Sequence, residues 1–230
     1  MLFMVATKFE DLAEQVYKTL RDMILAGELV PGQKLVQEAL SERLGVSRTP
    51  LLAAFSKLEK EMLVELVPRR GAFVKRLSPA ELLELYEVRL RLEPLGAFEA
   101  ARHIDAKGLK TLDAVLEAHR KAVENGAIPE VRMADFRFHM GIMRIAGNTV
   151  LERILSSFAI VSKSNQQGLM KSAAKSLTEH DALRDAIAAH DAALAEKLMY
   201  EHLSESRNVA ARLVAEGARM PHTAGASARA

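Results

Sequence analysis

Residues 35–74, LVQEALSERLGVSRTPLLAAFSKLEKEMLVELVPRRGAFV, decide the fold class of this chain. The pattern predicts a short helix over Val36–Leu44 that ends at Gly45, which suits the left-handed C-cap position. A second helix is predicted to begin after Ser47, a good N-cap, with Pro50 in its first turn. Two short helices around a tight turn are typical of a helix-turn-helix, which places its second helix in the major groove of DNA.

A predicted hairpin follows the second helix. Two apolar runs, residues 64–67 and 72–74, flank the turn Pro68-Arg69-Arg70-Gly71. A two-stranded wing with a basic tip completes the pattern of a winged helix-turn-helix. The second helix has an inward apolar stripe, so its outward side chains and the wing tip are the candidate DNA contacts: Arg48, Thr49, Leu52, Lys57, Arg69, Arg70 and Gly71.

Positive charge is concentrated in this segment. Residues 43–76 hold eight Lys/Arg against three Glu, an excess of five, whereas the whole chain carries a net charge of +2. DNA affinity depends largely on neutralising phosphates, so a focused basic patch is the expected footprint of a DNA-binding module. The alternative is that these charges form an ordinary solvated surface.

The composition sets further bounds. The 230 residues are 49% hydrophobic and include no cysteine, which excludes disulfides, thiolate metal sites and thiol nucleophiles. The N-terminal MLFMVA run is too short for a secretory signal, and no apolar run reaches the ~20 residues that span a bilayer. The expectation is a soluble, cytoplasmic protein.

The remainder of the chain predicts a mainly α protein. A first helix is expected over Phe9–Ala26, and Ser78-Pro79-Ala80-Glu81 is a capping box that opens a second, all-helical domain. Six helices with short connections favour an antiparallel bundle, and Pro94 is expected to kink or interrupt the first. The predicted ranges are Pro79–Ala101, Ala106–Glu124, Glu130–Ala146, Thr149 to about Asn165, Lys171–His190 and Ala192–Glu216. The predicted domains are residues 8–77 and 78–216, with a disordered tail over residues 217–230.

The helical domain contains a candidate metal site. Asp135 and His139 are four residues apart on one predicted helix, so both project from one face. His180 and His202 lie on or beside the apolar stripes of two later helices. Three imidazoles and a carboxylate pointing into a bundle core suit a divalent ion such as zinc, nickel, cobalt or manganese.

Other interpretations remain open at this level. A histidine on an apolar face is more often a satisfied core residue than a ligand, and a bound ion could also be purely structural. A metal-dependent hydrolase on the helical domain is the alternative function, but it would need a general base and a way to stabilise developing charge. Arg89 lies mid-helix between Glu87 and Glu93, so it could form surface ion pairs or, if buried, bind an anion.

Two stretches of the chain resemble known families. GELVPGQKLVQEALSERLGVSRTP with LVELVPRRGAFV resembles the DNA-binding domain of GntR-family bacterial transcription regulators. YEVRLRLEPLGAFEAA, DFRFHMGIMRIAGNTVL, EHDALRDAI and the closing EHL resemble the FCD effector-binding domain of the FadR-type branch. There are two departures: Leu52 replaces an arginine that the family generally uses on DNA, and Met62 replaces a glycine usual before the first wing strand.

The resemblance implies a sequence-specific transcription regulator rather than an enzyme. It implies a homodimer on a DNA operator, commonly a repressor, controlled by a small carboxylate or sugar-acid effector. It assigns the metal ligands to Asp135, His139, His180 and His202, with zinc the first choice of ion, and places Arg89 near the effector carboxylate. It gives no role to the remaining histidines, which are expected at the surface or at caps: His103, His119, His190 and His222. The effector, the operator, the regulated genes and the native metal are not encoded in recognisable motifs.

Overall fold

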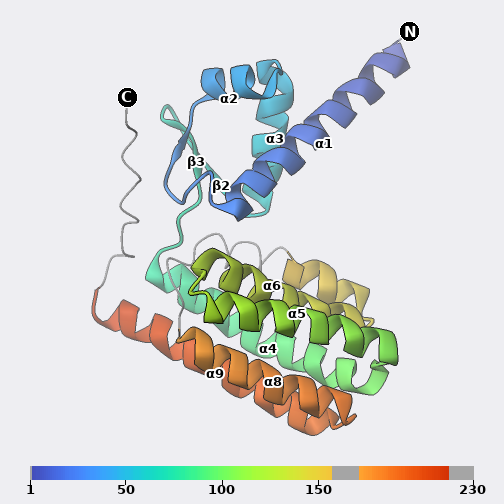
Figure 1. Ribbon diagram of the computed structural model, residues 1–230. Helices are drawn as coiled ribbons and strands as arrows, with labels where there is room; N and C mark the ends of the chain where they lie inside the picture. Colours follow the sequence, from blue (N-terminus) through green and yellow to red (C-terminus); the bar gives the residue numbers. More distant parts are fainter. Residues whose placement is uncertain (1, 157–170, 218–230) are drawn as a thin grey trace. The chain divides into compact units, whose positions relative to one another are not determined.

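The computed structural model describes residues 2–156 and 171–217, with side chains from residue 12 onward. The chain divides into two compact units, Met1–Arg76 and Leu77–Ala230. Each unit is described by itself below and can be followed in Figure 1. In the part of the chain that the structure describes, no helix is long and apolar enough to cross a membrane.

The N-terminal unit combines three helices with a small sheet. Its helices are α1 (Leu2–Ala26), α2 (Gln37–Leu44) and α3 (Arg48–Lys60), and its strands are β1 (Lys34–Leu35), β2 (Val64–Val67) and β3 (Gly71–Val74). The strands are antiparallel in the order β1-β3-β2. The two-stranded wing was predicted, whereas β1 was not, because two residues are too few to show an alternating pattern.

Helices α1 and α3 pack together to form the core of this unit. The side chains of Leu20, Leu51, Phe55 and Leu58 are fully buried there. Gly45 ends α2 in the left-handed conformation at φ 65°, as predicted. Ser47 occupies the N-cap of α3 with extended backbone angles, but its side chain makes no capping hydrogen bond. The turn therefore depends on backbone geometry and core packing more than on the expected serine cap.

Two residues of this unit hold a left-handed backbone without being glycine. Met62, between α3 and β2, has φ 58°, and Arg69, at the wing tip, has φ 63°. A side chain in this conformation costs about 1–2 kcal/mol, which glycine avoids. The Met62 geometry explains why a glycine is usual at this position in the family that the sequence resembles.

The C-terminal unit is a helical bundle. Its helices are α4 (Pro79–His103), α5 (Ala106–Glu124), α6 (Ile128–Ile145), α8 (Ala173–Ala188) and α9 (Ala192–Ala215). Residues 149–156 are also helical, but the predicted continuation to about Asn165 and the tail from residue 218 onward lie outside the described residues. Ser78 and Glu81 form the predicted capping box, and the side chains of Asp105 and Asp191 cap α5 and α9.

The helices of this unit lie side by side (Figure 1). Helix α9 packs along α4 and α8, while α5 packs along α6 and α8. Of the two outcomes expected at Pro94, an interruption is wrong, because α4 runs through it without a break, and a kink stays a prediction. Leu90, Pro94 and Ala97 are all buried on one side of α4, so packing outweighs the hydrogen bond that proline removes. This arrangement directs α4, α6, α8 and α9 toward a shared core.

Candidate functional site

The predicted reading face of α3 is exposed. Arg48, Thr49, Leu52 and Lys57 all lie on the solvent side, opposite the buried stripe that packs on α1. Arg48 pairs with Glu38 of α2 at 2.6 Å, and both side chains are about two-thirds exposed. Exposed ion pairs are worth about 0–1 kcal/mol, so a phosphate or a base edge can replace Glu38 at little cost.

Lys57 is engaged by α1. Its Nζ lies 2.5 Å from a Glu14 carboxylate oxygen and 3.9 Å from the centre of the Tyr17 ring. These contacts hold Lys57 on the α1 side of the reading helix. Arg48 and Thr49 at the helix start have no comparable tie to α1 among the contacts described.

The wing tip presents a second basic element. Arg69, Arg70 and Gly71 are exposed at the turn between β2 and β3, and Gly71 has φ 100°. The Arg70 guanidinium lies 5.6 Å from the centre of the Phe73 ring. The predicted DNA contacts thus occupy two exposed elements of one unit, α3 and the hairpin tip.

The four predicted metal ligands meet in the core of the C-terminal unit. Asp135 and His139 come from α6, His180 from α8 and His202 from α9, and one donor atom from each lies within 4.8 Å of the others. His202 Nε2 is 3.2 Å from His139 Nε2 and 3.4 Å from His180 Nε2. Asp135 Oδ1 is 3.6 Å from His180 Nε2. The histidines are buried, and Asp135 is partly exposed.

A buried carboxylate supports His139 from behind. Glu93 of α4 accepts a hydrogen bond from His139 Nδ1 at 2.6 Å, and its other oxygen pairs with Arg89. Burial alone would raise the pKa of Glu93. The charges of Arg89 and His139 outweigh this effect and hold the pKa below its usual range. The surface-pair interpretation of Arg89 is wrong, because its side chain is 7% exposed and Glu93 is its anion.

His202 has a comparable outer partner. Glu179 of α8 lies 2.8 Å from His202 Nδ1, and Lys171 Nζ contacts the same carboxylate and the His202 carbonyl oxygen. Burial opposes ionisation of Glu179, but the hydrogen bonds from His202 and Lys171 lower its pKa to about 2. Glu179 directly precedes His180 in sequence, yet its side chain contacts a different candidate ligand, His202.

His180 is held differently. Its ring stacks on Phe138 with centroids 4.3 Å apart, and its Nδ1 lies 3.4 Å from Nδ1 of His119 on α5. The expectation that His119 is a surface or cap residue is wrong, because it is fully buried. The missed signal is the stripe Leu112, Leu116, His119 on α5, whose spacing of four and three places the histidine on the buried face.

The electrostatics favour neutral imidazoles, the form that binds metals. Burial lowers the pKa of His180 well below its usual range, and it lowers that of His202 to about 4. Metal binding through Nε2 would place the proton on Nδ1 of His139 and of His202, where Glu93 and Glu179 can accept it; Lys171 Nζ also lies 2.9 Å from His202 Nδ1. Their Nε2 lone pairs then point toward each other and toward His180.

This donor set fits a divalent metal ion. At metal–ligand distances of about 2.1 Å, neighbouring donors in tetrahedral or octahedral geometry lie about 3.0–3.4 Å apart. The Nε2 separations of 3.2 and 3.4 Å agree with that spacing. Converging lone pairs repel one another unless a cation lies between them, so the arrangement suits a bound ion better than a set of core histidines that hydrogen-bond one another.

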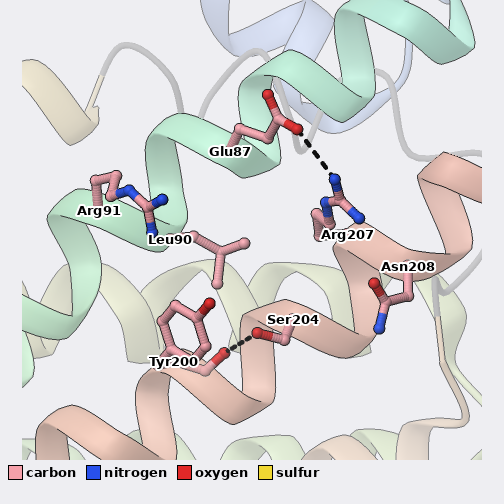
Figure 2. Close-up of a pocket in the computed structure, with 7 residues that line it drawn as sticks. All are labelled: Glu87, Leu90, Arg91, Tyr200, Ser204, Arg207 and Asn208. Carbon is pink, nitrogen blue, oxygen red and sulfur yellow. Dashed lines mark hydrogen bonds and ion pairs between the residues drawn. The ribbon is translucent and has the colours of Figure 1, made fainter.

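A polar groove runs along the outside of the same bundle. Glu87, Leu90 and Arg91 of α4 face Tyr200, Ser204, Arg207 and Asn208 of α9 across it (Figure 2). Arg207 reaches from α9 to Glu87 at 3.2 Å. The exposed apolar side chains of Val88, Leu95 and Tyr200 lie on the same two helices.

Both units match protein families. Residues 12–74 match the family described as bacterial regulatory proteins, gntR family, and residues 84–205 match the FCD domain. A transcriptional regulator of Streptomyces ambofaciens is 31% identical over 193 residues, which cover 82% of this chain and 80% of that protein. The transcriptional repressor RspR of Escherichia coli is 31% identical over 133 residues, 58% of each chain.

Solved structures share the fold. McbR/YncC of Escherichia coli has a TM-score of 0.74 at 20% identity and covers 88% of this chain and 98% of its own. A GntR regulator from Rhodococcus sp. RHA1 also has a TM-score of 0.74, at 24% identity, and covers 87% and 97%. The matching family and the sequence relatives are transcriptional regulators rather than enzymes, which confirms the predicted class and removes the hydrolase alternative. The chain is a GntR-family transcriptional regulator, with a winged helix-turn-helix domain followed by an FCD domain.

Proposed function

We propose that this regulator is a repressor whose operator binding is controlled by a small carboxylate bound at a divalent metal. Asp135, His139, His180 and His202 hold the ion, and zinc suits three imidazole donors and one carboxylate. The observation that carries the proposal is the convergence of three buried imidazoles, two of them backed by ionised carboxylates. Binding to chromosomal DNA places the protein in the cytoplasm.

The charge of the site favours an anionic effector. Glu93 is neutralised by Arg89, and Glu179 is neutralised by Lys171. Asp135 is then the one carboxylate at the centre, among the residues that the structure describes, whose charge no Arg or Lys ion pair neutralises, so a divalent ion leaves the centre with excess positive charge. When the ion is six-coordinate, the four protein donors leave two positions open, and the two oxygens of a carboxylate can fill them. Arg89 acts electrostatically on Asp135 and is the residue proposed to meet the effector.

The test measures metal, operator and effector together. Operators are selected from random DNA, and affinity is measured with and without a panel of small carboxylates and sugar acids. We expect salt-dependent, sequence-selective binding that a carboxylate weakens only when metal is present. Operator binding that responds to none of the panel in metal-loaded protein would count against effector control through this site.

A matched pair of histidine variants tests the ligand set. His139→Ala removes a ligand and is expected to lower metal affinity more than the ~10–100-fold typical of losing an outer partner. His103→Ala removes an exposed histidine of the same unit, 54% accessible, and should leave metal content unchanged. Elemental analysis after dialysis provides the measurement, and full occupancy in His139→Ala would exclude the assignment.

A homodimer is proposed to form through the α4–α9 face. Val88 and Leu95 lie on one stripe of α4, and Tyr200 is exposed on α9, where it lines the groove of Figure 2. In a dimer, two winged helix-turn-helix domains can bind the two half-sites of a palindromic operator at once, which a monomer cannot do. Leu95→Lys should shift the protein toward monomer in light scattering, whereas Val150→Lys, at a 66% exposed position, should not. A Leu95→Lys dimer of unchanged stability would place the interface elsewhere.

A further inference from the structure

Among the buried histidines of the described residues, His119 is the one that does not belong to the metal-donor group. It lies on α5, which supplies no ligand, and it is fully buried. Its Nδ1 faces His180 Nδ1 at 3.4 Å, while its buried Nε2 has no hydrogen-bond partner among the residues that the structure describes. A buried polar atom without a partner destabilises the folded protein unless another gain offsets it, so it calls for an explanation.

His119 is not placed to be a fifth ligand. The two nitrogens of an imidazole point in different directions, and His180 directs Nε2 toward His202 and Asp135. Its Nδ1 therefore faces away from the donor group, and His119 contacts that side of the ring. Any influence of His119 on the ion must pass through His180.

The proton count gives His119 a specific role. For His180 to bind an ion through Nε2, that nitrogen must carry a lone pair, so the proton is on Nδ1 and needs an acceptor. His119 Nδ1 is the acceptor nearby, and accepting places its own proton on Nε2. The unpartnered Nε2 is thus the consequence of offering an acceptor to His180, which a leucine of similar size would not do.

We infer that His119 is a positioning residue, whose Nδ1 fixes the tautomer and ring orientation in which His180 binds the metal. The inference rests on the metal site proposed above. It also separates this ligand from the other two, because His139 and His202 are backed by carboxylates and His180 by a neutral ring. A third carboxylate would cancel the positive charge that attracts the anionic effector, and a neutral acceptor preserves it.

Two isosteric substitutions isolate the acceptor. Asn places Oδ1 where His119 has Nδ1, whereas Leu has the same branched shape without an acceptor. We expect His119→Leu to lose about 10–100-fold in metal affinity, measured by competition with a chelator, and His119→Asn to remain within about threefold of the unsubstituted protein. The visible absorption bands of the Co²⁺-loaded protein should shift in His119→Leu and be restored in His119→Asn.

The thermal stability of the metal-free variants shows whether His119 positions His180 or only stabilises the fold. Because leucine removes an unpartnered buried donor, metal-free His119→Leu should melt no lower than metal-free His119→Asn. His119→Phe, which keeps a ring without an acceptor, repeats the comparison if His119→Leu packs badly. Unchanged metal affinity in both apolar variants, or an equal loss in His119→Asn, overturns the inference alone. Absence of metal binding by the unsubstituted protein overturns the proposed metal site together with it.

Discussion

The two units of this regulator treat charged side chains in opposite ways. In the N-terminal unit, Arg48 and Glu38 form a pair in which both side chains are about two-thirds exposed. In the C-terminal unit, Arg89 and Glu93 form a pair in which both are almost fully buried. An exposed pair is weak and easily exchanged, whereas a buried pair cannot be broken without leaving a desolvated charge. The predicted reading face therefore keeps Arg48 available for DNA, whereas the core of the helical bundle holds Arg89 and Glu93 in place.

The largest expected effect comes from breaking the buried pair. Glu93→Gln leaves Arg89 buried without its counter-ion, so it should destabilise the C-terminal unit by about 3–5 kcal/mol in urea denaturation. Glu99→Gln on the same helix is the control, because Glu99 faces the 58% exposed Arg102 and should lose less than about 1 kcal/mol. Equal losses in the two variants would mean that burial does not distinguish these pairs.

The role of the exposed Arg48 is tested by measuring DNA binding. Arg48→Ala should weaken operator binding by about 1–3 kcal/mol if Arg48 contacts a base edge, with no more than a small change in folding stability. Arg102→Ala removes an exposed arginine from the C-terminal unit and should leave DNA affinity unchanged. The measurement is a titration at fixed salt, and an unaltered affinity in Arg48→Ala would move recognition to other residues.

Leu52 bears on which bases the exposed face of α3 recognises. An exposed leucine on the reading helix can contact a thymine methyl but cannot hydrogen-bond guanine. We therefore expect an operator that differs from that of typical relatives, with Arg69 and Arg70 at the wing contributing more of the binding. Selection from random DNA measures this preference, and recovery of the usual family operator would contradict it.

Backbone strain separates function from stability within the N-terminal unit. Met62 and Arg69 both hold left-handed angles, so Met62→Gly and Arg69→Gly should each gain about 1 kcal/mol in thermal or urea unfolding. Only Arg69→Gly should weaken DNA binding, because only that variant removes a proposed phosphate contact. A loss of DNA affinity in Met62→Gly would show that its conformation serves recognition as well as the turn.

The sequence predicted the elements whose local signals are strong. The left-handed Gly45, the capping box at Ser78 and the outward face of α3 all follow from residues close in the chain. The convergence of the four candidate ligands was also predictable, because Asp135 and His139 share a helix face, His180 and His202 lie on or beside apolar stripes, and the FCD resemblance implies the same four residues. Pro94 shows the opposite case, since packing against other helices overrode a local signal.

The outer partners of the ligands could not be predicted in the same way. Glu93 reaches His139 across 46 positions of sequence, and His119 reaches His180 across 61. Lys171 and Glu179 meet His202 only because α8 and α9 pack together. Such contacts depend on tertiary packing: the stripe on α5 indicates that His119 is buried, but nothing local indicates that it faces His180.

The smallest expected effect is that of Glu38→Gln, which should change folding stability and DNA affinity in opposite directions. Glu38→Gln removes the carboxylate that occupies Arg48, so folding stability should fall by less than about 1 kcal/mol. DNA affinity should rise, because Arg48 no longer exchanges one anion for another and a negative charge leaves the phosphate-facing surface. Combining Glu38→Gln with Arg48→Ala should abolish the part of the gain that passes through the arginine. A full gain in the double variant would assign the effect to the charge of Glu38 alone, and a loss in the single variant would show that the pair positions Arg48 for binding.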